Sequence, residues 1–533
     1  MDAHPRMKRI AWTLPLVFFL VALLLGVGLE GEFPLNDDWR YAYPVKTWLK
    51  EGLPRPAVPF APTLLLQVGW GALFCWVGGG FSFLSLRGST LVAALLALWL
   101  FGRLSRRLGA SEAGALLAGL TLAFNPLFFS LTPTFMTDVP FLAILLAGFW
   151  FALCYLENGR LLSLTFAILA GVAAFLIRQP GILLLPALAG VLLMRSPRRF
   201  QTLVTAGALL LLTAGVLLGF EWLKESTPAL QAFYVPADEQ YLKLLFAQPL
   251  PFAETLLKRA LKSAIYLGLF AWPLLPLMDW RPRWGWAVSG LGGAALLTGA
   301  LVAAGYVFPF GGNVLFNFGL GPELLTDVYT LELPNTPALP SWAMVGLQWA
   351  GTVGAFGLLG LVPHWWRQAT PLQQRAGLFL LAFSLLYLPL MSVTSFFDRY
   401  LLPLIAAVLL LMSPRLRWKG LPALLPLIAF GWFSLAATHD YLSWNRARLQ
   451  AFQWCARQGI GIQELDAGYE LNGWLNHERG KAPAPGRSFW WVSDDRYLIS
   501  FGPVPGRELV HRVPYRRRLF PGMDTLLVSR RIE

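Results

Sequence analysis

Long apolar stretches recur from near residue 10 to residue 437, and short links between them carry most of the basic residues. A helix needs about 20 apolar residues to cross a bilayer. The chain is 56% hydrophobic and 14% charged, whereas soluble domains carry about 25% charged residues. The pattern predicts an all-α polytopic membrane protein with about 13 spanning helices. The candidate segments are roughly 10–29, 88–104, 112–131, 137–156, 161–177, 181–194, 202–222, 260–279, 285–307, 341–362, 376–391, 400–412 and 418–437.

One further apolar stretch, 63–86, decides the topology. If it does not cross and the N-terminus is cytoplasmic, every short cytoplasmic link carries Arg or Lys, as the positive-inside rule requires. If it crosses, the later basic links move to the outside. Its five glycines also favour a broken element. We therefore expect 63–86 to form a helix or helix pair along the outer surface. The basic links are Arg103/Arg106/Arg107, Arg160, Arg195/Arg198/Arg199, Arg281/Arg283, Arg367/Arg375 and Arg415/Arg417/Lys419.

Residues 438–533 differ in character, because apolar spans stop and charge density rises. Apolar and basic side chains alternate in 439–458 as in an amphipathic helix. Three short β-like runs follow between Gly/Pro turns, at Ser488–Val492, Tyr497–Phe501 and Thr525–Val528. We expect a transmembrane module at 1–437, with an outer loop 30–87 carrying juxtamembrane helices, and a small α/β extracytoplasmic domain at 438–533.

Acidic residues gather on the predicted outer side, where ionisable groups at a membrane edge indicate function. Asp37 and Asp38 follow the first span, within Asn36-Asp37-Asp38-Trp39-Arg40-Tyr41. Three further motifs open later helices at the same side, namely Thr137-Asp138-Val139-Pro140, Arg178-Gln179-Pro180-Gly181 and Phe397-Asp398-Arg399-Tyr400-Leu401-Leu402-Pro403.

In order and spacing these motifs resemble the GT-C superfamily of glycosyltransferases. They are most similar to the family 39 type, which includes bacterial aminoarabinose transferases and protein O-mannosyltransferases. The resemblance covers roughly residues 1–412, and the helix count agrees with the aminoarabinose transferase branch. Two departures affect donor contacts in the first outer loop. The second acid is Asp38 rather than Glu, and the segment 55–67 has no lysine.

The resemblance implies a GT-C fold and an integral-membrane glycosyltransferase. Such an enzyme moves a monosaccharide from a polyprenyl-phosphate donor to an extracytoplasmic acceptor hydroxyl on a lipid, glycan or protein. It also implies a bacterial inner (plasma) membrane location, with membrane lipids as surroundings. The basic links predict a cytoplasmic N-terminus and a periplasmic C-terminus. Nucleic acid is not an expected partner, because topology explains the basic clusters behind the net charge of +14.

Three carboxylates are the predicted catalytic groups. Asp37 is the first candidate for the base that takes the acceptor proton, and Asp38 would hold Arg40, the acceptor or a metal. Both could instead be solvated loop residues that cap the next helix, and Asp37 and Arg40 could form a local ion pair. Asp138 could act across the cavity from Asp37, or could simply suit the dipole in the first turn of its helix.

Four basic residues are candidates for the donor phosphate. Arg178 could bind it through a planar fork or could snorkel to the interface. Arg399 has Asp398 beside it as an alternative partner. Arg40 and Lys243 complete the set, and such residues also face water or anionic lipid.

Two further expectations concern a metal ion and aromatic residues that stack on a sugar. Asp37 and Asp138, with Asp38, could supply oxygen ligands to Mg²⁺ or Mn²⁺ as an optional cofactor. Trp39 and Tyr41 could stack on a sugar, although aromatic residues at span ends also form interface belts.

Two other functions stay open from the sequence. A secondary transporter or flippase of a lipid-linked or anionic substrate would show internal repeats and midplane charges, and we find neither. A non-catalytic membrane scaffold would tolerate the change Asp37→Asn.

Overall fold

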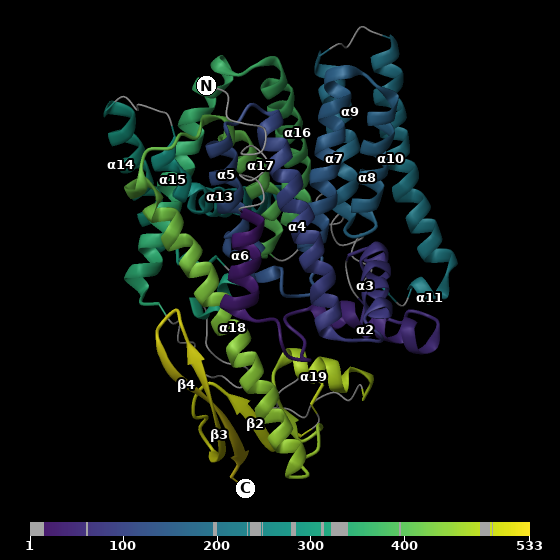
Figure 1. Ribbon diagram of the computed structural model, residues 1–533, viewed down its shortest axis with the longest axis vertical. Helices are drawn as coiled ribbons and strands as arrows, with labels where there is room; N and C mark the ends of the chain where they lie inside the picture. The colour runs from purple at the N-terminus through teal and green to yellow at the C-terminus, as the bar shows by residue number, and fades with distance from the viewer. Residues whose placement is uncertain are drawn as a thin grey trace.

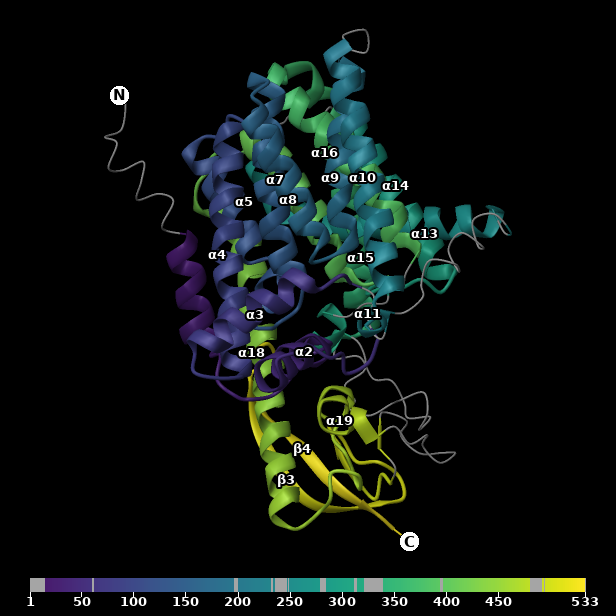
Figure 2. The same cartoon turned by 90° about the vertical axis from the view of Figure 1, so that its right-hand side faces the viewer.

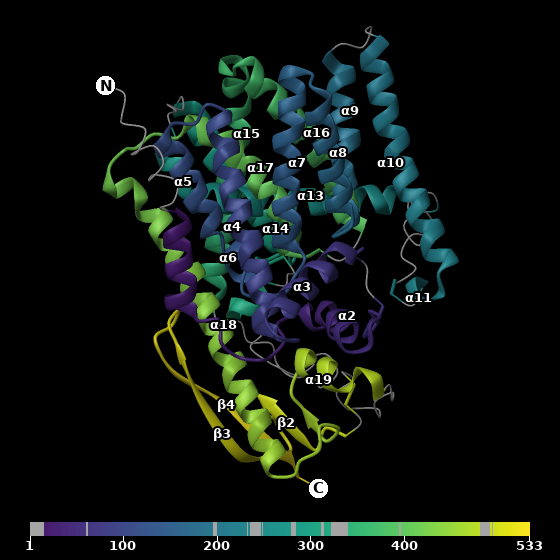
Figure 3. The ribbon, with the colours of Figure 1, turned by 45° about the vertical axis from the view of Figure 1, so that its right-hand side comes forward.

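A long helical bundle stands on a small sheet domain in the computed structural model (Figure 1). The structure describes residues 15–59, 62–195, 200–231, 233–234, 247, 249–278, 284–310, 314–320, 339–393, 396–479, 491–492 and 494–532. We call the end of the bundle that meets the sheet domain the domain end. The helix α2 lies across this end, below the long helices (Figure 3).

The helices are α2 (Asp38–Glu51), α3 (Leu65–Val77), α4 (Phe83–Arg107), α5 (Glu112–Ala123), α6 (Pro126–Leu131), α7 (Asp138–Asn158), α8 (Leu161–Phe175), α9 (Leu184–Arg195), α10 (Phe200–Ser226), α11 (Pro228–Gln231), α13 (Pro249–Ala271), α14 (Trp284–Ala303), α15 (Ser341–Gln368), α16 (Pro371–Val393), α17 (Leu402–Met412), α18 (Leu425–Arg457) and α19 (Tyr469–Asn476). Short 3₁₀ or π segments are η1 (Ala22–Val27), η2 (Gln179–Leu183), η3 (Trp272–Leu277), η4 (Phe316–Leu320), η5 (Asp398–Leu401), η6 (Ser413–Arg415), η7 (Leu421–Leu424) and η8 (His477–Arg479).

In the described part of the chain, seven helical stretches are long and apolar enough to cross a membrane, and six shorter apolar helices accompany them. The chain is therefore a multi-pass membrane protein. Helices occur at each of the 13 predicted spans, so the predicted helical fold class is confirmed.

The ambiguous stretch 63–86 is broken, as its glycines predict. Helix α3 ends at Val77, and α4 begins at Phe83, where the Ser82 hydroxyl accepts hydrogen bonds from two backbone N–H groups of its first turn. The helix begins five residues before the span expected at roughly 88–104. Arg87 belongs to this helix, and its side chain is fully buried. The burial is tolerated because its guanidinium donates to the carbonyls of Leu29, Gly31 and Phe33 at 2.7–2.8 Å.

Three of the predicted basic links meet at the end of the bundle opposite the sheet domain. Arg107 pairs with Glu157 there, Arg375 donates to the Leu156 carbonyl, and Arg415 donates to the Trp365 carbonyl. Links that are far apart in sequence therefore lie on one side.

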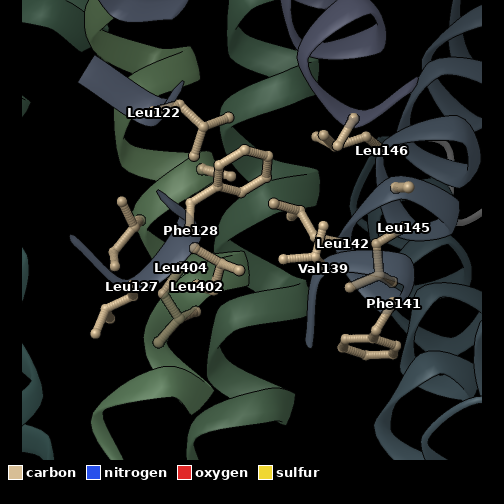
Figure 4. Packing of buried hydrophobic residues seen from close by; sticks show 14 of the residues in the cluster. Leu122, Leu127, Phe128, Val139, Phe141, Leu142, Leu145, Leu146, Leu402 and Leu404 are labelled. Atoms are coloured by element: carbon tan, nitrogen blue, oxygen red, sulfur yellow. The ribbon is translucent and has the colours of Figure 1, made fainter. Parts of the chain in front are cut away.

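The core runs continuously between the early and late helices. Figure 4 shows Phe128 of α6, Leu142 of α7 and Leu404 of α17 packed together, and all three are buried. This packing holds α6, α7 and α17 against one another.

Among its described residues the sheet domain contains four strands in the order β1-β2-β4-β3, namely β1 (Leu465–Asp466), β2 (Tyr497–Ser500), β3 (Arg507–Arg517) and β4 (Gly522–Arg531). The pair β1–β2 is parallel, and the other two pairs are antiparallel. Val513, Tyr515 and Val528 face α18 and pack with Ala447 and Ala451 of that helix.

Helix α18 passes through the predicted boundary at 437/438, so one helix belongs to both parts. The last span and the amphipathic helix of the prediction are continuous. Of the three predicted β-like runs, the second and third correspond to β2 and β4. Residues 488–490 of the first lie outside the described residues, and 491–492 are not in a strand.

Candidate active site

Asp37 sits at the turn into α2 with its carboxylate directed away from the helix. Asn36 adopts a left-handed conformation (φ 56°), and Asp37 holds the N-cap position without making a side-chain cap. Its Oδ2 accepts a hydrogen bond from Arg399 Nη2 at 3.0 Å. Its Oδ1 accepts from the Tyr469 hydroxyl at 2.9 Å. Neither the predicted helix cap nor the predicted local ion pair with Arg40 occupies this carboxylate.

Asp38 is built differently from its neighbour. It is fully buried, and its two oxygens accept from the backbone N–H groups of Leu35 at 2.7 Å and Phe135 at 3.3 Å. It therefore joins the first loop to the loop before α7. The expectation that Asp38 holds Arg40 is wrong, because Arg40 donates to the Pro59 carbonyl instead.

Arg399 is nearly fully buried and reaches Asp37 from the far end of the chain. Asp398 does not take its guanidinium. The Asp398 carboxylate instead accepts from the backbone N–H groups of Val314 at 3.1 Å and Leu315 at 2.8 Å, and from that of Arg399 at 2.7 Å. Asp398 thus fixes the backbone from which the Arg399 side chain projects.

A second buried ion pair lies beside the first. Arg178 pairs with Asp138 Oδ1, and its guanidinium lies 4.4 Å from the centre of the Tyr400 ring. Arg399 lies 5.5 Å from the same ring, and the charge of Asp138 also acts on Arg399. Asp138 Oδ2 is buried without a hydrogen-bond partner in the described residues. Two guanidiniums therefore lie near the Tyr400 ring at the domain end, and each of them pairs with a carboxylate.

The sheet domain closes this site from below, with α19 lying under α2 (Figure 2). Trp39 is fully buried against Tyr469 and Trp491, with ring centres 5.9 and 5.2 Å away. A Cβ on Gly473 would lie 2.3 Å from the Trp39 ring. Trp39 thus anchors the domain, and Tyr41 is also buried. Neither ring presents an open face for a sugar, contrary to the expected stacking role.

The two neighbouring acids differ in charge state. Burial raises the pKa of Asp37, but the positive charges of Arg399 and Arg40, with the Tyr469 hydroxyl, outweigh it and leave the pKa below its usual range. Burial raises the pKa of Asp38 to about 7, because two backbone hydrogen bonds compensate only in part. Asp37 therefore stays a carboxylate at neutral pH, whereas Asp38 keeps its proton to a higher pH than an ordinary aspartate.

The remaining predicted roles are placed as follows. Lys243 lies outside the described residues. Within the part of the chain that the structure describes, no group of three or more His, Cys, Asp or Glu side chains could hold a metal ion. Asp37 and Asp138 each face an arginine, and this donor set suits a charge-balanced cluster better than a cation site.

Tyr469 and Tyr400 are site residues that the sequence analysis missed. Tyr400 lies in the motif that contains Asp398 and Arg399. It was not selected because the sequence analysis chose site residues by their charge. Tyr469 lies 432 positions from Asp37, and no local pattern connects the two.

Residues 68–222 match the family model described as dolichyl-phosphate-mannose-protein mannosyltransferase. The predicted resemblance is confirmed. The matched region contains Asp138 and Arg178, whereas Asp37 and Arg399 lie outside it.

Among solved structures, the chain is similar to ArnT from Cupriavidus metallidurans. The apo form is 14% identical with a TM-score of 0.41, and the form bound to undecaprenyl phosphate is 14% identical with a TM-score of 0.39. Each match covers 97% of both chains. The Saccharomyces cerevisiae Pmt1-Pmt2 complex bound to the sugar donor gives 15% identity and a TM-score of 0.32, over 43% of this chain and 35% of that one. No curated protein sequence matches the chain.

Proposed function

We propose that the chain is a membrane glycosyltransferase that moves a monosaccharide from a polyprenyl-phosphate donor to a hydroxyl acceptor. The observation that carries this proposal is the charged cluster of Asp37, Arg399, Asp138 and Arg178 beside Tyr400. Four distant segments converge to build it. The matching family is described by a dolichyl-phosphate-linked donor, which is the same chemical class.

Asp37 is the proposed base. Its carboxylate is charged at neutral pH but is a weak base while Arg399 holds it. A donor phosphate that engages Arg399 draws the positive charge away from Asp37. The pKa of Asp37 then rises toward the operating pH, where proton removal from an acceptor is most effective. Donor binding would thereby make Asp37 a stronger base.

Arg178 and Arg399 are the proposed phosphate ligands. Guanidiniums bind phosphate oxygens bidentately, and in a buried site they stabilise the charge that develops as the carrier phosphate leaves. Asp138 orients Arg178 through their ion pair. Arg399 Nε has no hydrogen-bond partner among the described residues, which leaves one donor for an incoming oxygen.

Two further basic residues and a divalent cation were also predicted to contribute to the site. Arg40 adds positive charge near Asp37, and Lys243 could extend the phosphate site. A divalent cation at Asp37 and Asp138 would need to displace both arginines, so the proposed steps do not pass through one. The acceptor class, whether lipid, glycan or protein, is left for the assay.

The proposed orientation puts the domain end on the extracytoplasmic side and the N-terminus in the cytoplasm. It is supported by the basic links that meet at the opposite end, near Arg107, Arg375 and Arg415, since cytoplasmic loops carry the excess of basic residues. A bacterial inner membrane is the proposed location.

The test is a donor panel. Purified protein in lipid nanodiscs is incubated with polyprenyl-phosphate sugars that differ in the sugar, and release of the carrier phosphate is measured. We expect release with at least one sugar and none with the Asp37→Asn variant. No release with any donor would contradict the proposal, and movement of an intact donor between leaflets would favour a flippase instead.

A further inference from the structure

The turn between β3 and β4 combines three arginines with an apolar end. Its sequence is Arg516-Arg517-Arg518-Leu519-Phe520-Pro521-Gly522-Met523, and we call residues 516–523 the hairpin tip. Phe520 is 42% exposed and Met523 is 68% exposed, and the two lie three residues apart in one turn. Exposed apolar side chains that cluster in this way mark an interaction surface.

The hairpin tip lies at the end of the first apolar helix. The Arg518 guanidinium donates to the Gly26 carbonyl. The backbone N–H groups of Arg518 and Leu519 donate to the Asp440 carboxylate of α18 at 2.7 and 2.9 Å. Leu25 of η1, next to Gly26, is 80% exposed, and Figure 3 shows the turn beside the lower end of this first helix, drawn in purple. The tip is therefore level with the place where the apolar outer surface of the bundle ends and the headgroups of a bilayer begin.

One arginine of the tip is available to a ligand. Arg517 pairs with Asp524 at 3.1 Å. Arg516 is exposed and forms no ion pair within the described part of the chain. It lies directly opposite Met523 in the β3–β4 register, and residues opposite each other in a ladder share one face of the sheet. A basic and an apolar side chain therefore project side by side from the tip.

The leaflet at the domain end offers a partner for both side chains at one depth. Apolar and aromatic side chains rest at the boundary between headgroups and acyl chains, and basic side chains reach the lipid phosphates. We infer that the hairpin tip anchors the sheet domain to anionic lipid, with Phe520 and Met523 in the edge of the leaflet and Arg516 on a lipid phosphate. Lipid is favoured over a protein partner because the tip continues the lipid-facing surface at Leu25.

A fluorescent label at the tip distinguishes lipid from water. Met523→Cys is labelled with bimane in the full-length protein carrying Cys154→Ala, since Cys75 and Cys455 are buried. The labelled protein is placed in nanodiscs that contain phospholipids with a nitroxide close to the headgroup, and quenching by the nitroxide is compared with quenching by aqueous iodide.

Leu509→Cys is the matched control. Leu509 is an apolar residue of β3 with 44% exposure, but it lies about 25 Å from the tip at roughly 3.3 Å per residue. Nitroxide lipid should quench the label at Met523→Cys several-fold more than the control, and iodide should show the reverse. Equal access of iodide to both labels would place the tip in water. Protection of the tip from both quenchers would indicate cover by a second copy or another protein, and either result would overturn the inference.

Arg516→Gln tests the charge of the lipid. Nitroxide phosphatidylglycerol and nitroxide phosphatidylcholine are compared at equal content, and wild type should be quenched more by the anionic lipid. Arg516→Gln should lower this preference by about 5-fold, the effect of one arginine near an anionic surface. Arg530→Gln is the control, because Arg530 pairs with Glu508 at the far end of the sheet, and it should keep the preference.

An equal preference in wild type and Arg516→Gln would overturn the role of Arg516. None of these measurements uses turnover. A failed transfer assay would therefore contradict the proposed function and leave the lipid anchor intact.

Discussion

Asp37 and Asp38 are adjacent in sequence, but their carboxylates have different kinds of hydrogen-bond partner. Side chains from Arg399 and Tyr469 hold the first carboxylate, and 18% of that side chain is exposed. Backbone N–H groups hold the second, which has no exposed surface. Side-chain partners can be exchanged for a substrate at small cost, whereas backbone partners are part of the fold. The comparison separates a candidate for chemistry from a structural acid.

The largest expected effect comes from exchanging each acid for its amide. Asp37→Asn should lower transfer by about 10²- to 10⁴-fold, the usual contribution of a general base, and should also lower the unfolding temperature, because the buried Arg399 loses its charged partner. Asp38→Asn should lower the unfolding temperature, since an amide cannot accept from both N–H groups, and should keep measurable transfer. Carrier-phosphate release and thermal unfolding in detergent give both readouts. The reverse pattern would show that the two roles are exchanged.

Next in size is Arg399→Lys, which tests whether the partner of Asp37 also acts on the donor. A lysine keeps the charge but loses the planar fork. We expect kcat/KM for the donor to fall about 10²-fold, comparable to losing one preorganised donor in other enzymes. Arg446→Lys is the matched control. Arg446 binds the carbonyls of Val27 and Gly28 away from the cluster, so its kcat/KM should stay near that of wild type.

The pH dependence of stability should isolate Asp38. Its pKa is about 7 in the folded protein, against an ordinary 3.8, so between pH 4 and 7 the folded state keeps a proton that the unfolded state releases. The contribution of Asp38 to stability is therefore lost as pH rises through this window. It amounts to about 4 kcal/mol, at about 1.4 kcal/mol per unit of pKa difference. Thermal unfolding from pH 4 to 8 should show this slope in wild type, and Asp38→Asn should lack it. An equal slope in both proteins would refute the assignment.

The smallest expected effect tests the link between Asp37 and the sheet domain. In Gly473→Ala the new methyl group collides with Trp39, so α19 must move, at about 1–3 kcal/mol. Proteolysis should then release the sheet domain faster, and transfer should fall a few-fold because Tyr469 moves with α19. Gly502→Ala is the control, since a Cβ there meets nothing within 4 Å. Unchanged proteolysis in Gly473→Ala would contradict this link.

The sequence predicted the helices and the membrane edge at which Asp37, Asp138, Arg178 and Arg399 gather, because apolar length and basic links are local signals. It could not predict which acid pairs with which arginine. Asp37 and Arg399 are 362 positions apart, and the choice depends on how α2 and α17 pack.

Other misses have the same physical origin. The role of Asp38 depends on a backbone N–H of Phe135, 97 positions away. Strand β3 escaped prediction because Pro514 and exposed arginines interrupt its run, although Val513 and Tyr515 keep the period of two on the buried face. Burial of Arg87 required carbonyls that only the folded first loop supplies.

Helix α18 is 33 residues long, which corresponds to about 50 Å at 1.5 Å per residue. One part of this helix packs among the apolar helices, and the other part packs against β3. A nanobody that binds the sheet and shifts it would therefore also shift the part of α18 that lies among the apolar helices, without entering the lipid. In the proposed orientation, ligands of that sheet would therefore act on the buried half of the protein from outside the membrane.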